Sequence, residues 1–117
     1  MPQPEAILQR EIEVAVGALD GVVCSRNNVG MAVHHGGARV EYGVGGRGAP
    51  DLLCEVRTPI GTWAAVWLEV KTASGSLEKH QQQWHAAAQR MGRHVFVVRS
   101  GDDALSVVNG FRNGGCP

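Results

Sequence analysis

Two apolar stretches of the sequence, residues 51–57 and 63–71, flank a short turn centred on Ile60. Both stretches have the length and the residue types of β-strands, and the turn between them contains a proline and a glycine. An antiparallel hairpin about this turn pairs residues whose numbers add up to 120, so that Leu52 faces Leu68. The same register pairs Cys54 with Val66 and Val56 with Ala64. One face of the hairpin is therefore wholly apolar, and we expect it to pack on the core of the protein.

The opposite face of the hairpin brings two acidic side chains together. Asp51 lies directly opposite Glu69 in this register, with their Cβ atoms roughly 5 Å apart. Two like charges so close repel each other, and a hard divalent cation such as Mg²⁺ would compensate for them. Lys71 points to the same face because it lies two residues beyond Glu69. This set suits metal-assisted hydrolysis of a phosphodiester; the alternative is an ordinary hairpin with a turn aspartate and surface charges.

The rest of the chain predicts helices and shorter strands around this hairpin. We expect helices over 4–19, 76–91 and 102–111, and strands over 22–26, 31–35, 39–42 and 94–99. Ser76 is the expected N-cap of the second helix and Gly92 its C-terminal stop. The element order predicts one α/β domain over residues 1–117, with a mixed β-sheet flanked by helices.

Composition narrows the function classes. Eleven Lys and Arg residues balance eleven Asp and Glu residues, which excludes a polybasic membrane anchor and an acidic mimic. We find no apolar run long enough to span a membrane and no signal peptide, so we expect a cytoplasmic protein. The three cysteines lack a C-x-x-C spacing and predict neither a disulfide framework nor a zinc site. Arginine outnumbers lysine, which indicates a phosphate partner or a codon bias.

Two polar residues lie on helix faces that otherwise look apolar. Glu11 falls between Ile7 and Ala15 on the first helix. Gln81 falls near Trp84 on the second, on a face that also includes Leu77, Ala88 and Met91. Each could lie at the edge of its apolar stripe. Together with Asp51, Glu69 and Lys71, however, they suggest one polar pocket, where Glu11 is a further metal ligand and Gln81 orients water or contacts a phosphate.

Several other motifs carry less weight. The glycine-rich run 43–48 fits G-x-G-x-x-G, but Pro50 and a strand follow it instead of a helix, so we reject a dinucleotide site. We interpret all five histidines, including His80 and His85 on the second helix, as surface or structural residues. Trp63 and Trp67 share the face of Asp51 and would serve an interface, a DNA platform or packing against the helices.

These residues resemble the PD-(D/E)xK nuclease superfamily. Pro50-Asp51 matches its first acidic motif, and Glu69-Val70-Lys71 matches its second. The closer resemblance is to the VRR-NUC branch, the virus-type replication–repair nucleases. It rests on the following segments: Arg26-Asn27-Asn28-Val29-Gly30, Gly46-Arg47-Gly48-Ala49-Pro50-Asp51-Leu52-Leu53, Gly75-x-Leu77 and Gln81-x-x-Trp84. The chain has Glu78-Lys79 where that branch often has Ser-Pro, which affects only the start of the helix.

The resemblance implies a restriction-endonuclease-like core and a DNA endonuclease that depends on Mg²⁺ or Mn²⁺. It implies a catalytic set of Glu11, Asp51, Glu69, Lys71 and Gln81, with Glu11, Asp51 and Glu69 as metal ligands. The candidate DNA contacts are Arg26, Arg47, Gly48, Ser74 and Lys79. Small members of the branch resemble homodimeric, structure-specific nucleases of phages and bacteria, some acting on four-way (Holliday) junctions in repair. The alternatives are a non-catalytic nucleic-acid-binding module of the same fold and a sequence-specific restriction-type nuclease.

Overall fold

The computed structural model describes residues 4–28, 30–33, 36–37 and 39–114. Its elements follow the predicted order, and their bounds are α1 Glu5–Gly17, β1 Val22–Arg26, β2 Gly30–Val33, β3 Arg39–Tyr42, β4 Leu52–Arg57, β5 Trp63–Val70, α2 Lys79–Arg90, β6 His94–Val98 and α3 Gly101–Arg112. Within these described residues, no helix is long and apolar enough to cross a membrane. His34, His35 and Cys116, to which the predictions for the histidines and cysteines also applied, lie outside the described residues.

A four-stranded sheet with the order β1-β4-β5-β6 forms the centre of the structure. The strand pairs β1–β4 and β4–β5 are antiparallel, whereas β6 runs parallel to β5. Helix α2 makes the crossover that a parallel pair requires. The predicted hairpin register is confirmed, with Leu52 opposite Leu68 and Cys54 opposite Val66. The expected mixed sheet is confirmed as well.

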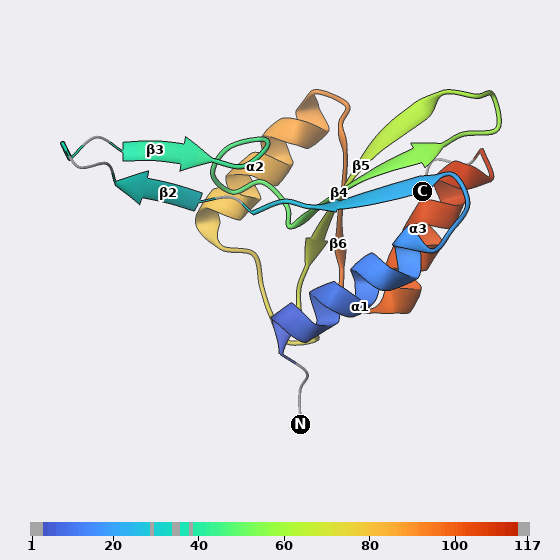
Figure 1. Cartoon of the computed structure of the whole chain (residues 1–117), viewed down its shortest axis with the longest axis horizontal. Helices are drawn as coiled ribbons and strands as arrows, with labels where there is room; N and C mark the ends of the chain where they lie inside the picture. The colour runs from blue at the N-terminus through green and yellow to red at the C-terminus, as the bar shows by residue number, and fades with distance from the viewer. Residues whose placement is uncertain (1–3, 29, 34–35, 38, 115–117) are drawn as a thin grey trace.

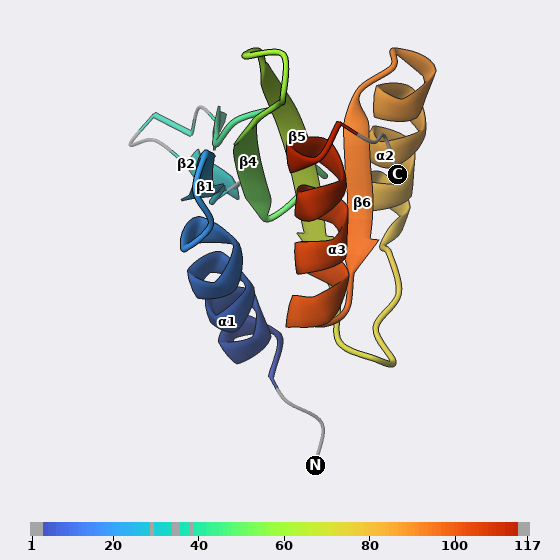
Figure 2. The same cartoon turned by 90° about the vertical axis from the view of Figure 1, so that its right-hand side faces the viewer.

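Helices cover both faces of this sheet. In Figure 2, α1 and α3 lie on one side of the strands and α2 lies on the other. The face toward α1 and α3 is the predicted apolar one, since Leu52, Leu68, Ile12 and Val108 are all fully buried in one cluster there. The face toward α2 has a smaller cluster that includes Trp67, Ala88 and Val95. The polar face of the hairpin therefore meets α2.

Strands β2 and β3 form a separate two-stranded sheet. Figure 1 shows this hairpin as an arm that projects from the side of the main sheet. The segments on either side of the arm are β1 and the glycine-rich loop that leads to Asp51. Both of these belong to the site described below.

Helix α2 begins later than the sequence predicted. The predicted N-cap, Ser76, is wrong; Glu78 is the N-cap, and its backbone N–H donates to Gln81 Oε1 at 2.9 Å. Residues before it form a loop because Arg99 Nη1 donates to the carbonyl oxygens of Thr72 at 2.7 Å and Gly75 at 2.6 Å. These tertiary hydrogen bonds hold the chain out of a helical path. The predicted start of the last helix is close, with Ser100 as an N-cap that accepts from Asp103 N–H.

Candidate active site

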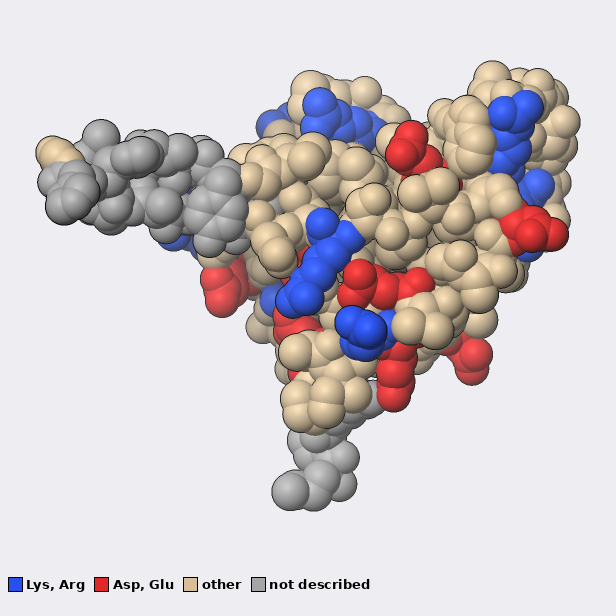
Figure 3. All heavy atoms as spheres, in the orientation of Figure 1, with Lys and Arg blue, Asp and Glu red and all other residues tan. Residues whose placement is uncertain are grey.

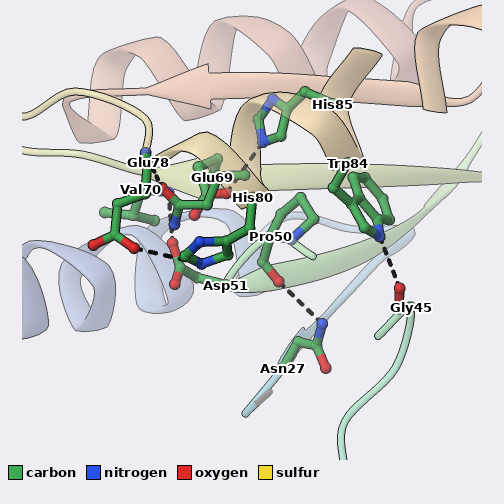
Figure 4. Close-up of polar contacts among 11 residues, drawn as sticks. Asn27, Gly45, Pro50, Asp51, Glu69, Val70, Glu78, His80, Trp84 and His85 are labelled. Carbon is green, nitrogen blue, oxygen red and sulfur yellow. Dashed lines mark hydrogen bonds and ion pairs between the residues drawn. The ribbon is translucent and has the colours of Figure 1, made fainter. Parts of the chain in front are cut away.

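The predicted pair of carboxyl groups lies at one end of the β4–β5 hairpin. Asp51 immediately precedes β4, and Glu69 is the second-last residue of β5. Asp51 Oδ2 accepts a hydrogen bond from the backbone N–H of Val70 at 2.9 Å, which fixes the aspartate against the neighbouring strand (Figure 4). The confirmed register of β4 and β5 thus brings Asp51 and Glu69 together, as the sequence predicted.

Burial makes this pair electrostatically unfavourable when both groups are charged. Burial, together with the adjacent Glu69 carboxyl, raises the pKa of Asp51 to about 7. The pKa of Glu69 is also raised, mainly by burial, because this side chain is only 1% exposed. Among the described residues, Glu69 Oε2 is a buried oxygen without a hydrogen-bond partner. A buried carboxylate oxygen left this way is costly, and a bound cation would relieve that cost.

Lys71 supplies positive charge at the same place. Its side chain is buried, and its backbone N–H donates to the Val98 carbonyl oxygen at 3.1 Å, which ties it to the end of β6. The positive charge of Lys71 lowers the pKa of Asp51 and of Glu69, but burial outweighs it for both. The ammonium group therefore acts on the carboxylate pair without neutralising it. The predicted grouping of Asp51, Glu69 and Lys71 agrees with this geometry.

His85 joins the site from helix α2, and the sequence analysis missed it as a site residue. Its Nε2 lies 3.1 Å from Glu69 Oε1, and both side chains are buried (Figure 4). Burial lowers the pKa of His85, so the neutral imidazole is favoured. Of the two alternatives given for the histidines, surface or structural, the buried His85 fits the structural one, whereas His80 is partly exposed and lies 3.4 Å from Glu78. The i, i+3 spacing of His85 and Ala88, the buried residues of α2, was the available sign in the sequence.

The glycine-rich loop is folded so that it delivers Asp51 to the sheet. Asn27 Nδ2 donates to the carbonyl oxygens of Val44 at 2.8 Å and Pro50 at 3.0 Å, and Asn27 Oδ1 accepts from Val44 N–H at 2.9 Å. Gly48 has a φ of +89°, and a Cβ there would lie 2.4 Å from the carbonyl oxygen of His80. Only glycine allows this contact with α2. Gly48 is buried by this contact, and its role as a DNA contact stays a prediction.

Aromatic packing holds α2 on this face of the sheet. The rings of Trp84 and Trp67 meet edge to face, with centroids 5.0 Å apart. Trp84 Nε1 also donates to the Gly45 carbonyl oxygen at 2.8 Å. Trp67 is thus covered by α2, which was one of the open alternatives. Trp63 is 49% exposed, and the guanidinium of Arg57 lies 5.5 Å from the centroid of its ring.

The first helix turns a different residue toward the core than the sequence predicted. Its buried residues are Leu8, Ile12 and Val16, and Ile7 is 51% exposed. The prediction that Glu11 lies on the buried face is therefore wrong: Glu11 is exposed and borders a groove that Arg26 also lines. Glu5, in the first turn, is the α1 carboxylate whose charge raises the pKa of Glu69. Glu5 shares the helix face of Leu8 and Ile12 because of its spacing from them.

The other predicted residues lie around the site. Gln81 is partly buried, and its Oε1 accepts from Glu78 N–H at the start of α2; its role in orienting water or contacting a phosphate stays a prediction. The side chains proposed to contact DNA are exposed, and these are Arg26, Arg47, Ser74 and Lys79. Of these, Arg26 is nearest in the sheet to Asp51, because it pairs with Leu52. Figure 3 shows acidic and basic side chains interspersed over this view of the described residues, with no continuous basic surface.

The donor set fits a divalent cation of the Mg²⁺ type. In the part of the chain that the structure describes, no three His, Cys, Asp or Glu side chains form a group that could hold a metal ion. Mg²⁺ instead requires only one or two protein carboxylates and takes its other ligands from water and phosphate. Asp51 and Glu69 meet that requirement, and Glu69 Oε2, which has no hydrogen-bond partner among the described residues, could bind such an ion.

Comparisons with known proteins identify the fold. No protein-family model matches the sequence, and no curated protein matches it. A solved structure described as a VRR_NUC domain is similar to this chain, with a TM-score of 0.60 and 24% sequence identity. The similarity covers 92% of this chain and 96% of that one. The chain therefore has the fold of a VRR_NUC domain, and the predicted restriction-endonuclease-like core is confirmed.

Proposed function

We propose that this chain, with its VRR_NUC fold, is a nuclease that hydrolyses phosphodiester bonds in DNA with the help of Mg²⁺ or Mn²⁺. The observation that carries the proposal is the pair of the partly buried Asp51 and the buried Glu69, in which both pKa values are raised and one Glu69 oxygen has no partner among the described residues. Lys71 adds the positive charge that such chemistry needs. Two carboxylates this close repel each other when both are charged, and a bound divalent cation would offset that cost.

Each member of the set has a distinct task in this proposal. Asp51 and Glu69 would hold the cation, which would supply Lewis-acid chemistry for the hydrolysis of the phosphodiester. The Lys71 ammonium stabilises the negative charge that develops on the phosphate, and it orients the attacking water. Burial strengthens both effects, because charges interact more strongly away from bulk water. A role for Glu11 as a further ligand stays a prediction, although the burial on which it rested is wrong.

We also propose that the protein acts as a homodimer on branched DNA, including four-way junctions. One chain of 117 residues with no net charge offers little surface for a branched substrate, and a two-fold axis would supply two sites. The exposed cations Arg26, Arg47 and Lys79 are the proposed contacts to phosphates. Light scattering of the purified chain tests the dimer, and a monomeric mass with and without junction DNA would contradict it.

A cleavage assay tests the nuclease activity. Labelled linear duplex, single-stranded, flap and four-way-junction DNA are incubated with Mg²⁺, Mn²⁺ or EDTA, using wild type and Lys71→Ala. We expect metal-dependent cutting that is fastest on branched DNA and lost in Lys71→Ala, while the variant still binds DNA. Arg93→Ala is the control, since it removes an exposed cation from the turn between α2 and β6. Tight binding without cutting by the wild type would favour the non-catalytic binding module, and cutting by Lys71→Ala would remove the lysine from the mechanism.

A further inference from the structure

The contact between His85 and Glu69 joins a helix to a candidate metal ligand. Nε2 of His85 lies 3.1 Å from Oε1 of Glu69, and the exposed fractions of the two side chains are 8% and 1%. Glu69 has two oxygens, and this contact uses one of them. The other, Oε2, has no partner among the described residues. The hydrogen bond thus distinguishes the two oxygens of one carboxylate.

We infer that His85 is a positioning residue, which holds Glu69 Oε1 so that Oε2 is presented to a divalent cation shared with Asp51. The inference rests on the proposed function, because it concerns the same metal site. A glutamate side chain has three rotatable bonds, and fixing it in advance saves conformational entropy when a ligand binds. Hydrogen-bonded partners of metal ligands have this effect on metal affinity in general.

His85 is itself held in place by the packing of α2. Its ring lies edge to face with Trp84, with centroids 6.1 Å apart. Trp84 in turn packs on Trp67 and donates to Gly45. Helix α2 also touches Gly48, three residues before Asp51, through the carbonyl oxygen of His80. One rigid helix therefore supports the strand that carries Glu69 and the loop that leads to Asp51.

The protonation state of His85 does not decide this role. An imidazole can donate from Nε2 in its neutral form, and it does so in its charged form as well. The charged groups that interact with the ring are Glu69, Asp51 and Lys71. Since Nε2 is directed at Glu69, it is not oriented to bind the cation directly. The contribution of His85 is the position of the carboxylate.

Binding of Mn²⁺ to the DNA-free protein tests the inference. Calorimetry compares wild type, His85→Leu, which removes the donor, and His85→Gln, which keeps an N–H donor on a flexible side chain. We expect His85→Leu to weaken Mn²⁺ binding by about 10- to 100-fold and His85→Gln to recover most of that loss. His94→Leu is the matched control, because it removes a partly buried histidine that packs on Phe111, away from the carboxylate pair. That control should bind Mn²⁺ as the wild type does.

A cleavage readout separates positioning from general destabilisation. In His85→Leu, the Mn²⁺ concentration for half-maximal cleavage should rise, and the rate at saturating Mn²⁺ should recover. Wild-type Mn²⁺ affinity in His85→Leu, or a His85→Gln variant as weak as His85→Leu, would overturn the inference and leave the nuclease proposal intact. If His85→Leu fails to fold, the Mn²⁺ affinity of His85→Gln is compared with that of His94→Leu. A modestly lower affinity in His85→Gln alone supports the inference, and equal affinities in the two variants overturn it. A wild-type protein that binds no Mn²⁺ would overturn the proposed function and the inference together.

Discussion

Replacing Asp51 with asparagine removes one charge from the carboxylate pair and changes the side chain very little. The amide oxygen of the new side chain can still accept the hydrogen bond from Val70 N–H that Asp51 Oδ2 accepts at 2.9 Å. The substitution therefore isolates the electrostatic cost of the pair. In the absence of divalent cations we expect Asp51→Asn to stabilise the folded protein at pH 8.

The pKa of Asp51 gives the sign and the size of this effect. It is raised from 3.8 to about 7, mainly by burial and then by Glu69. Because the folded protein binds this proton more tightly than the unfolded chain, the stability falls as pH rises from about 4 to about 7. Above about pH 7 the whole of this stability is lost, and the loss amounts to about 4 kcal/mol at most. Residual solvent contact and relaxation reduce it, so we expect a gain of about 1–3 kcal/mol for Asp51→Asn at pH 8.

Mg²⁺ should reverse the order of the two proteins. A ligand that binds only the folded state, at a concentration about 1,000 times its Kd, adds about 4.1 kcal/mol to the free energy of unfolding, which exceeds the expected advantage of the variant. The wild type gains this stabilisation, whereas Asp51→Asn has lost one of the two carboxylates and gains far less. The variant is thus the more stable protein in EDTA and the less stable one in Mg²⁺.

Urea denaturation followed by circular dichroism measures the difference, in EDTA and in Mg²⁺, at pH 4 and pH 8. Glu55→Gln is the matched control, since Glu55 is an exposed acid on β4. We expect it to change the free energy of unfolding by less than about 0.5 kcal/mol under all conditions. Two results would refute the reasoning. In one, Asp51→Asn is less stable than the wild type in EDTA at pH 8; in the other, Mg²⁺ does not change the difference in stability between the two proteins.

Two further predictions concern the loop and the first helix. Gly48→Ala should lower the free energy of unfolding by more than about 2 kcal/mol, because its Cβ meets the His80 backbone at 2.4 Å and its φ is +89°; Gly46→Ala, with a φ of +78° and no atom within 4 Å, should cost only about 1 kcal/mol by the same denaturation assay. Glu5→Gln should lower the pKa of Glu69, because the charge of Glu5 raises it. At a pH where Glu69 is charged in both proteins, the variant should also bind Mn²⁺ more weakly in calorimetry, because one negative charge near the site is lost. Glu11→Gln should change that binding less, and the opposite order would restore Glu11 as the ligand.

The hairpin and its carboxylate pair could be predicted from the sequence because strand periodicity and a short turn determine the register. A pairing in which residue numbers add up to 120 leaves one face wholly apolar, and a shift by one residue would bury charges. The observed pairs, such as Leu52 with Leu68, are those predicted. The positions of Asp51, Glu69 and Lys71 follow from that register alone.

The errors arose where tertiary contacts decide. On α1, Ile7 and Leu8 are equally apolar, so the sequence does not show which of them faces the core. Packing buries Leu8 and leaves Ile7 51% exposed. The buried face therefore differs from the predicted one by about one residue, and Glu11 does not lie on it. On α2, Ser76 is a good local cap, but Arg99 holds the preceding loop from 24 and 27 residues away. The role of His85 could not be predicted, because the residue pattern of a helix does not show which strand residue its side chains will contact. Only the packing of α2 on β5 and β6 reveals Glu69 as its partner.

Whether Asp51 and Glu69 bind one divalent cation between them is tested most directly by anomalous diffraction from crystals soaked in Mn²⁺. A single strong peak should lie in contact with Glu69 Oε2 and an Asp51 oxygen, while His85 keeps its hydrogen bond to Glu69 Oε1. The peak should be absent from Asp51→Asn crystals treated in the same way. Wild-type crystals with no peak at this pair, or with Mn²⁺ bound only elsewhere, would contradict the metal site and the phosphodiester hydrolysis proposed to depend on it.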